Sequence, residues 1–235
     1  MVLLSAQSQA PGFQVALGEL YSIYWYPLYA YIRRRGHTSE EAQDLIQGFF
    51  VHLLEHETLG RADPLKGKFR SFLLGSLQNY LSTEADRTHC VKRGGKVEFV
   101  PLDVQDAEER YRLEPVEALT PEKIFAARWA MALLGEAVNR LRQEYATRNN
   151  MATVETLKAF LDVANSKDPP SYEQAAAALQ VSVGAVKTLI HRLRKRYTAL
   201  LREEIGRTIS DPADVGAEIH ELCEALALAE GWIVP

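Results

Sequence analysis

Apolar residues recur along most of the chain at steps of three and four, the spacing of one buried face of an α-helix. This pattern predicts a first helix from Leu17 to Ile32, a second that begins at Thr38 or Ser39, and a third from about Phe69. Arginines close the first helix and glutamates open the second, which is the arrangement that the helix dipole favours. These three helices can bury a common core without any strand.

A second group of helices is expected further along. Pro121 is predicted to open a helix that reaches Tyr145, and a shorter helix follows from about Thr153 to Asn165. One helical face after Arg207 carries four apolar residues, Val215, Ile219, Leu222 and Leu226. The chain is therefore predicted to be all-α.

The stretch from Tyr172 to Ile205 has the pattern of a helix-turn-helix. Tyr172–Leu179 is expected to form a short helix, residues 180–182 a turn, and Val183 to start a longer helix with one apolar stripe. Polar and basic side chains occupy the other face of that helix, namely Lys187, Thr188, His191, Arg192, Arg194, Lys195 and Arg196. Such a helix fits the major groove of duplex DNA. We expect the first three to contact base edges and the last four, three arginines and one lysine, to contact phosphates. The alternative is a solvated basic face on an ordinary core helix.

Composition limits the class of protein. The chain has 235 residues, of which 47% are hydrophobic and 25% charged, so it is long enough for one large domain or two small ones. It has no run of about 18 apolar residues and no secretory signal pattern at its start, so we expect a cytoplasmic protein without membrane contact. The two cysteines, Cys90 and Cys223, lie far apart, which indicates neither a disulfide framework nor a cysteine zinc site.

The net charge of −4 is unevenly distributed. Residues 66–96 are strongly basic, residues 98–122 are strongly acidic, and the second helix of the helix-turn-helix is basic again. We therefore expect two small helical domains joined by a flexible linker, with a domain at 12–96, an acidic linker at 97–121, a second domain at 122–207 and an extension at 208–235.

Two blocks together resemble a known family. The block SYEQAAAALQVSVGAVKTLIHRLRKR resembles region 4 of sigma-70-type RNA polymerase sigma factors, with Gly184, Val186 and Lys187 in step with the family pattern. The blocks EEAQDLIQGFFVHLLE and KGKFRSFLLGSLQNYLSTEADR are similar to region 2 of the extracytoplasmic-function group. The resemblance implies a sigma factor that directs core RNA polymerase to promoters, is not an enzyme and needs no cofactor.

The resemblance also implies roles for residues and partners. The second helix would dock on the clamp helices of the polymerase β′ subunit through Glu40, Glu41, Asp44 and Gln47. Seven residues would bind the opened −10 element, namely Lys66, Lys68, Arg70, Asn79, Arg87, Lys92 and Arg93. The helix-turn-helix would read the −35 element of promoter DNA beside the flap of the β subunit. An anti-sigma factor or a Ser/Thr kinase is the kind of regulator that the family implies.

The chain departs from the family pattern in the docking helix and in the turn. Gln43 and Gly48 stand where acidic residues are usual. Because docking depends on acidic charge, phosphorylation of a nearby hydroxyl would restore it, with Thr38, Ser39 and Thr58 as candidate sites; the alternative is that other contacts compensate. In the helix-turn-helix, Gln180 replaces the glycine of the turn, where a left-handed backbone costs other residues about 1 kcal/mol.

Other interpretations remain open. The runner-up is a one-component transcription regulator that uses the helix-turn-helix alone. A distant alternative is a zinc hydrolase, because His52, Glu55 and His56 spell the H-x-x-E-H pattern. The tail is expected to extend the C-terminal core, to bind a partner, or to cover the basic helix-turn-helix with its acidic residues Asp211, Asp214, Glu218 and Glu221.

Overall fold

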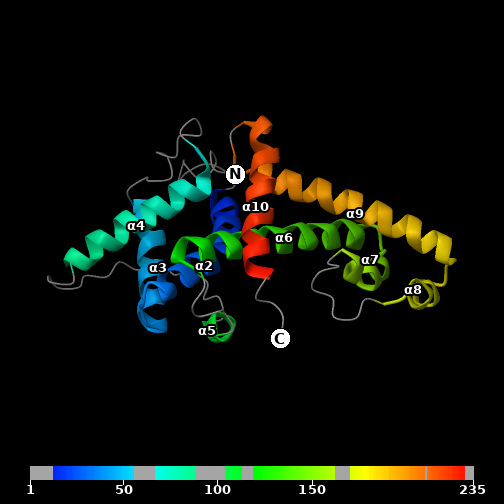
Figure 1. Cartoon of the computed structure of the whole chain (residues 1–235), viewed down its shortest axis with the longest axis horizontal. Coiled ribbons are helices and arrows are strands. Elements are labelled where there is room, and N and C mark those ends of the chain that lie inside the picture. Colours follow the sequence, from blue (N-terminus) through cyan, green and yellow to red (C-terminus); the bar gives the residue numbers. More distant parts are fainter. Residues whose placement is uncertain are drawn as a thin grey trace. The chain divides into compact units, whose positions relative to one another are not determined.

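The computed structural model describes residues 13–55, 67–87, 104–112, 119–161, 170–209 and 211–230. All regular secondary structure in these ranges is helical and none is a strand, so the predicted all-α fold is confirmed. No helix in this part of the chain is both long enough and apolar enough to span a membrane. The helices labelled in Figure 1 fall into two compact units.

The first unit takes the described residues within Met1–Met131 and Gly206–Trp232. Its elements are α2 (Phe13–Arg34), α3 (Ser39–Glu55), α4 (Phe69–Arg87), α5 (Val104–Arg112), the beginning of α6 (Pro121–Thr147), the 3-10 turn η4 (Pro212–Asp214) and α10 (Val215–Glu230). Large side chains such as Tyr24, Phe49 and Leu73 are fully buried in its core. Trp129 of α6 is also buried there, and its indole Nε1 donates to the Tyr24 hydroxyl at 3.2 Å.

Local hydrogen bonds explain where α3 begins. The Thr38 hydroxyl accepts from the Glu41 amide at 3.2 Å, and the Glu41 carboxylate accepts from the Thr38 amide at 2.8 Å. This capping box satisfies amides that have no partner inside the helix. Thr38 is therefore the N-cap, and the predicted starts of α3 and of α4 at Phe69 are confirmed.

The second unit takes the described residues within Ala132–Ile205. It holds the rest of α6, α7 (Met151–Leu157), the 3-10 turn η3 (Lys158–Phe160), α8 (Tyr172–Leu179) and α9 (Val183–Gly206). Leu141, Leu157 and Leu193 are among its fully buried core residues. The helix expected from about Thr153 begins earlier, at Met151, and tightens into η3 after Leu157.

The helix-turn-helix has the predicted boundaries. Ser171 caps α8 through a capping box with Gln174, at 3.1 Å and 2.8 Å. Gln180 ends α8 with φ 54° and ψ 42°, which is the expected left-handed conformation. The Gln180 amide donates to Ala177 O at 3.3 Å and the Val181 amide to Ala176 O at 3.0 Å, so the turn closes as a Schellman motif.

One segment differs from the sequence prediction. We expected a flexible linker over 97–121, yet Val104–Arg112 within it is the helix α5. Ala107 of α5 is buried, and Tyr111 packs against the small cluster of Ala30, Leu119 and Ile124. At least this part of the expected linker is therefore a packed element of the first unit.

Candidate functional site

The residues expected to dock on polymerase form an exposed face of α3. Glu40, Glu41, Asp44 and Gln47 are all solvent-exposed. Residues 40, 44 and 47 are spaced by four and three positions, so they share one side of the helix. Hydrogen bonds from the Thr38 amide and hydroxyl hold the pKa of Glu41 below its ordinary value, so this carboxylate stays negative. The face therefore carries acidic charge, although Gln43 and Gly48 replace acidic residues of the motif that the helix resembles.

Gly48 has a steric reason for lacking the usual acid. A Cβ at this position would lie 2.2 Å from the Tyr80 hydroxyl and 3.4 Å from the ring carbon that carries it. The Tyr80 ring in turn packs against two side chains of α3. Its centroid lies 5.7 Å from that of the Phe49 ring and 5.4 Å from that of the His52 ring. Because α4 approaches α3 so closely here, an acidic side chain at position 48 would require Tyr80 to move.

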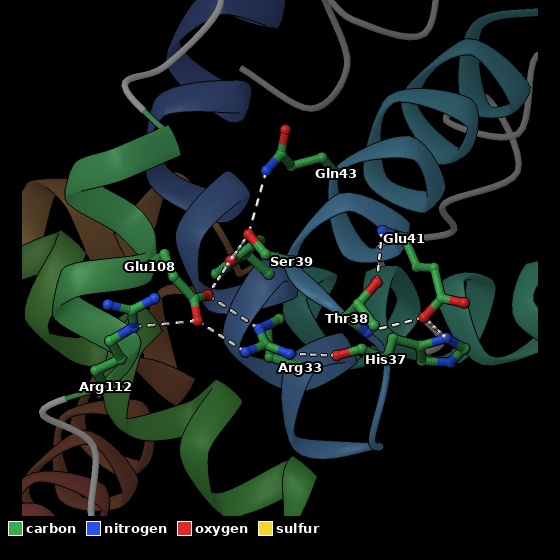
Figure 2. Close-up of polar contacts among 9 residues, drawn as sticks. Arg33, His37, Thr38, Ser39, Glu41, Gln43, Glu108 and Arg112 are labelled. Atoms are coloured by element: carbon green, nitrogen blue, oxygen red, sulfur yellow. Dashed lines mark hydrogen bonds and ion pairs between the residues drawn. The ribbon is translucent and has the colours of Figure 1, made fainter.

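An ion-pair cluster lies beside the beginning of α3 (Figure 2). The guanidinium of Arg33 donates to both carboxylate oxygens of Glu108, at 3.1 and 2.8 Å, and the Tyr29 hydroxyl donates to the same carboxylate at 2.6 Å. Burial raises the pKa of Glu108, but the bonds and charges of Arg33 and Tyr29 outweigh this and hold that pKa below its ordinary value. Glu108 belongs to α5. Its ion pair was not predicted from the sequence, because its partners in α2 are 75 and 79 positions away.

The candidate phosphorylation sites differ in accessibility. Thr38 is exposed, although its hydroxyl caps α3. Ser39 is half-buried, and its hydroxyl lies 2.9 Å from the Tyr29 hydroxyl. The same Ser39 hydroxyl accepts from the side-chain Nε2 of Gln43 at 3.3 Å (Figure 2). Thr58 lies outside the described residues. Of the two that are described, Thr38 is the more accessible to a modifying enzyme.

The residues expected to bind the −10 element are only partly described. Lys66, Lys92, Arg93 and the side chain of Arg87 lie outside the described part of the chain. Asn79 is exposed on α4. Lys68 Nζ lies 2.6 Å from Glu218 and Arg70 Nε 2.7 Å from the same carboxylate, and both cations also pair with Glu221. Lys68 and Arg70 are therefore both paired with carboxylates of the C-terminal helix α10.

These pairs correct one expectation about the tail. The tail was expected to extend the C-terminal core, to bind a partner, or to cover the basic helix-turn-helix with acidic residues that include Glu218 and Glu221. These two glutamates instead contact Lys68 and Arg70 of the first unit. The Phe69 amide also donates to Thr208 O at 3.4 Å. Sequence reasoning missed this contact because Arg70 and Glu218 are 148 positions apart.

The basic face of α9 remains largely open. Lys187, Thr188, His191, Arg192 and Lys195 are exposed. Arg194 is exposed as well, but its guanidinium donates twice to Phe160 O, at 3.0 and 2.8 Å. Arg196 pairs with Glu144 and Glu203, and its hydrogen bond to Glu144 is the main cause that raises its pKa. Six of the seven expected DNA-binding residues are thus exposed and Arg196 is half-buried, while the guanidinium groups of Arg194 and Arg196 are both hydrogen-bonded within the protein.

The zinc pattern has no support in the described residues. The His52 ring is half-buried against Tyr80. His56 and the side chain of Glu55 lie outside the described part. No cluster of three or more His, Cys, Asp or Glu side chains placed to hold a metal ion occurs among the residues that the structure describes.

Comparison of the chain with protein-family models, with curated proteins and with solved structures gives no match. The function proposed below is therefore inferred from the sequence blocks and from the surfaces described above.

Proposed function

We propose that this protein is a sigma factor of the extracytoplasmic-function type, which directs core RNA polymerase to promoters. The observation that carries the proposal is the helix-turn-helix of α8 and α9. Its first helix is capped at both ends, and the exposed side of its second helix carries Lys187, Arg192 and Lys195. A recognition helix in the major groove needs this combination of a rigid turn and a basic outer face.

Within this proposal, α3 is the docking element for the β′ clamp helices. Its acidic face is exposed, and the Thr38 capping box fixes the beginning of the helix. The nearby cation Arg33 is paired with Glu108, so its charge opposes the acidic face less than an unpaired arginine would. The protein itself would catalyse nothing, because the polymerase performs the chemistry.

A binding experiment with core RNA polymerase tests the proposal. Reversing one charge of the docking face, Asp44→Arg, should weaken binding by about a hundredfold or more, since placing like charges opposite each other in an interface costs several kcal/mol. Glu224→Arg makes the same charge reversal at an exposed carboxylate of α10, so it is the matched control and should bind as the parent does. Binding of duplex DNA without any binding of polymerase would contradict the proposal and favour a one-component regulator.

A further inference from the structure

The inner face of α10 has an unusual composition. Val215, Ile219, Leu222 and Leu226 line the side of the helix that is buried or half-buried, as the apolar spacing requires. Glu218 lies in the middle of this stripe, and its side chain has no solvent exposure. A buried carboxylate needs cationic partners. The helix is therefore selective for a surface that offers cations beside an apolar patch.

Lys68 and Arg70 supply these partners. Their side chains keep 26% and 12% of their exposure, and each contacts both Glu218 and Glu221. The Arg70 guanidinium also lies 4.7 Å from the centroid of the Trp129 ring, which is within cation–π distance. Two cations thus face two carboxylates, and the contact is neutral as a whole.

We propose that α10 is an internal competitor of single-stranded DNA for Lys68 and Arg70. The inference rests on the proposed function, in which these cations track the backbone of the opened promoter strand. Phosphate groups and the carboxylates of Glu218 and Glu221 require the same donors, so both cannot be bound at once. DNA binding at this surface therefore requires α10 to leave it.

Charge-removing variants of the full chain test the competition. The probe is a fluorescent single-stranded oligothymidylate, whose backbone offers phosphates without a particular sequence. Glu218→Gln with Glu221→Gln should bind it about tenfold more tightly than the parent chain, because the fraction with accessible cations rises. Leu222→Ala weakens the apolar side of the contact without changing any charge and should also tighten binding.

Matched variants separate competition from a general charge effect. Glu224→Gln removes an exposed carboxylate from the same helix, and we expect parent-like affinity. Adding Lys68→Ala to the double variant Glu218→Gln, Glu221→Gln should remove most of the gain in affinity for the oligonucleotide. Hydrogen exchange of the α10 amides in the parent chain should speed up when oligothymidylate is added, which reports release of the helix directly.

The outcomes distinguish this inference from the proposed function. If the parent chain binds the oligonucleotide through Lys68 and the double variant binds no more tightly, competition by α10 is refuted while the DNA-binding function stands. Equal tightening by Glu224→Gln would likewise refute it, since only overall charge would then matter. If none of the variants binds the probe, both the competition and the assignment of Lys68 and Arg70 to DNA are contradicted.

Discussion

Single residues show where packing and backbone geometry explain departures from the sequence pattern that the chain resembles. Gly48 is a contact point between α3 and α4, and Gln180 holds a left-handed turn that glycine would adopt more readily. Both departures were visible in the sequence, but only Gln180 had a structural interpretation there. The reason for Gly48 lies in Tyr80, on another helix, and no local pattern reveals such a partner.

Replacing Gln180 with glycine should stabilise the second unit. The φ of 54° strains a residue with a Cβ, and the change should raise the free energy of unfolding by up to about 1 kcal/mol. Gln180→Ala keeps the strain and is the matched control, with no comparable gain. Urea unfolding measures both, and equal stability of the glycine and alanine variants would show that this turn is unstrained.

The effects of substitutions at Gly48 and Tyr80 on the free energy of unfolding should be coupled. Gly48→Ala is expected to lower the free energy of unfolding by about 1–3 kcal/mol, because its Cβ meets the Tyr80 hydroxyl at 2.2 Å. In a Tyr80→Phe background the nearest atom is the ring carbon at 3.4 Å, so the same change should become neutral or favourable. A double-mutant cycle in urea gives the coupling, and additive effects would contradict the close approach.

Elements gain their roles from contacts that join distant parts of the sequence. The starts of α3, α4 and α6 and both limits of α8 followed from apolar spacing and capping residues, which are local signals. The helix α5 was missed because its nine residues are mostly charged. It is held by Glu108 and Tyr111, whose partners lie on α2.

The N-terminus of α3 offers a test of the phosphorylation hypothesis. Thr38→Asp keeps the cap and adds a negative charge, whereas Thr38→Asn keeps the cap without the charge. If added charge restores docking, the aspartate variant should bind core polymerase more tightly than the asparagine variant. Titration of labelled polymerase compares the two. Equal affinities would mean that charge at Thr38 does not control docking, and would leave Ser39 and Thr58 as candidates.

The contact of α5 should depend on pH. Since the pKa of Glu108 lies below that of a free glutamate, its stabilisation is complete above about pH 4.3 and is lost as the pH falls through the folded-state pKa. Glu108→Gln should therefore cost about 1.5–3 kcal/mol of unfolding free energy at neutral pH and almost nothing at strongly acidic pH. Glu109→Gln, on the exposed side of α5, is the control. A cost that does not change with pH would argue against the ion pair with Arg33.

At the scale of the whole molecule, the sequence predicts the helical class and two surfaces with opposite charge. The acidic face of α3 and the basic face of α9 were found because their residues are close in sequence and exposed. The pairing of α10 with Lys68 and Arg70 could not be found this way, since spacing within α10 says only that one face is buried. A glutamate inside an apolar stripe was the available signal, and it points to a cationic partner without naming it.

Transcription from promoter DNA tests the central claim most directly. Purified chain is mixed with core RNA polymerase and a library of genomic fragments, and the transcripts are mapped to their start sites. The account predicts defined start sites that appear only with the added chain and that weaken with Asp44→Arg and with substitution of Lys187 and Arg192. Polymerase that initiates at the same sites with and without the chain would contradict its function as a sigma factor.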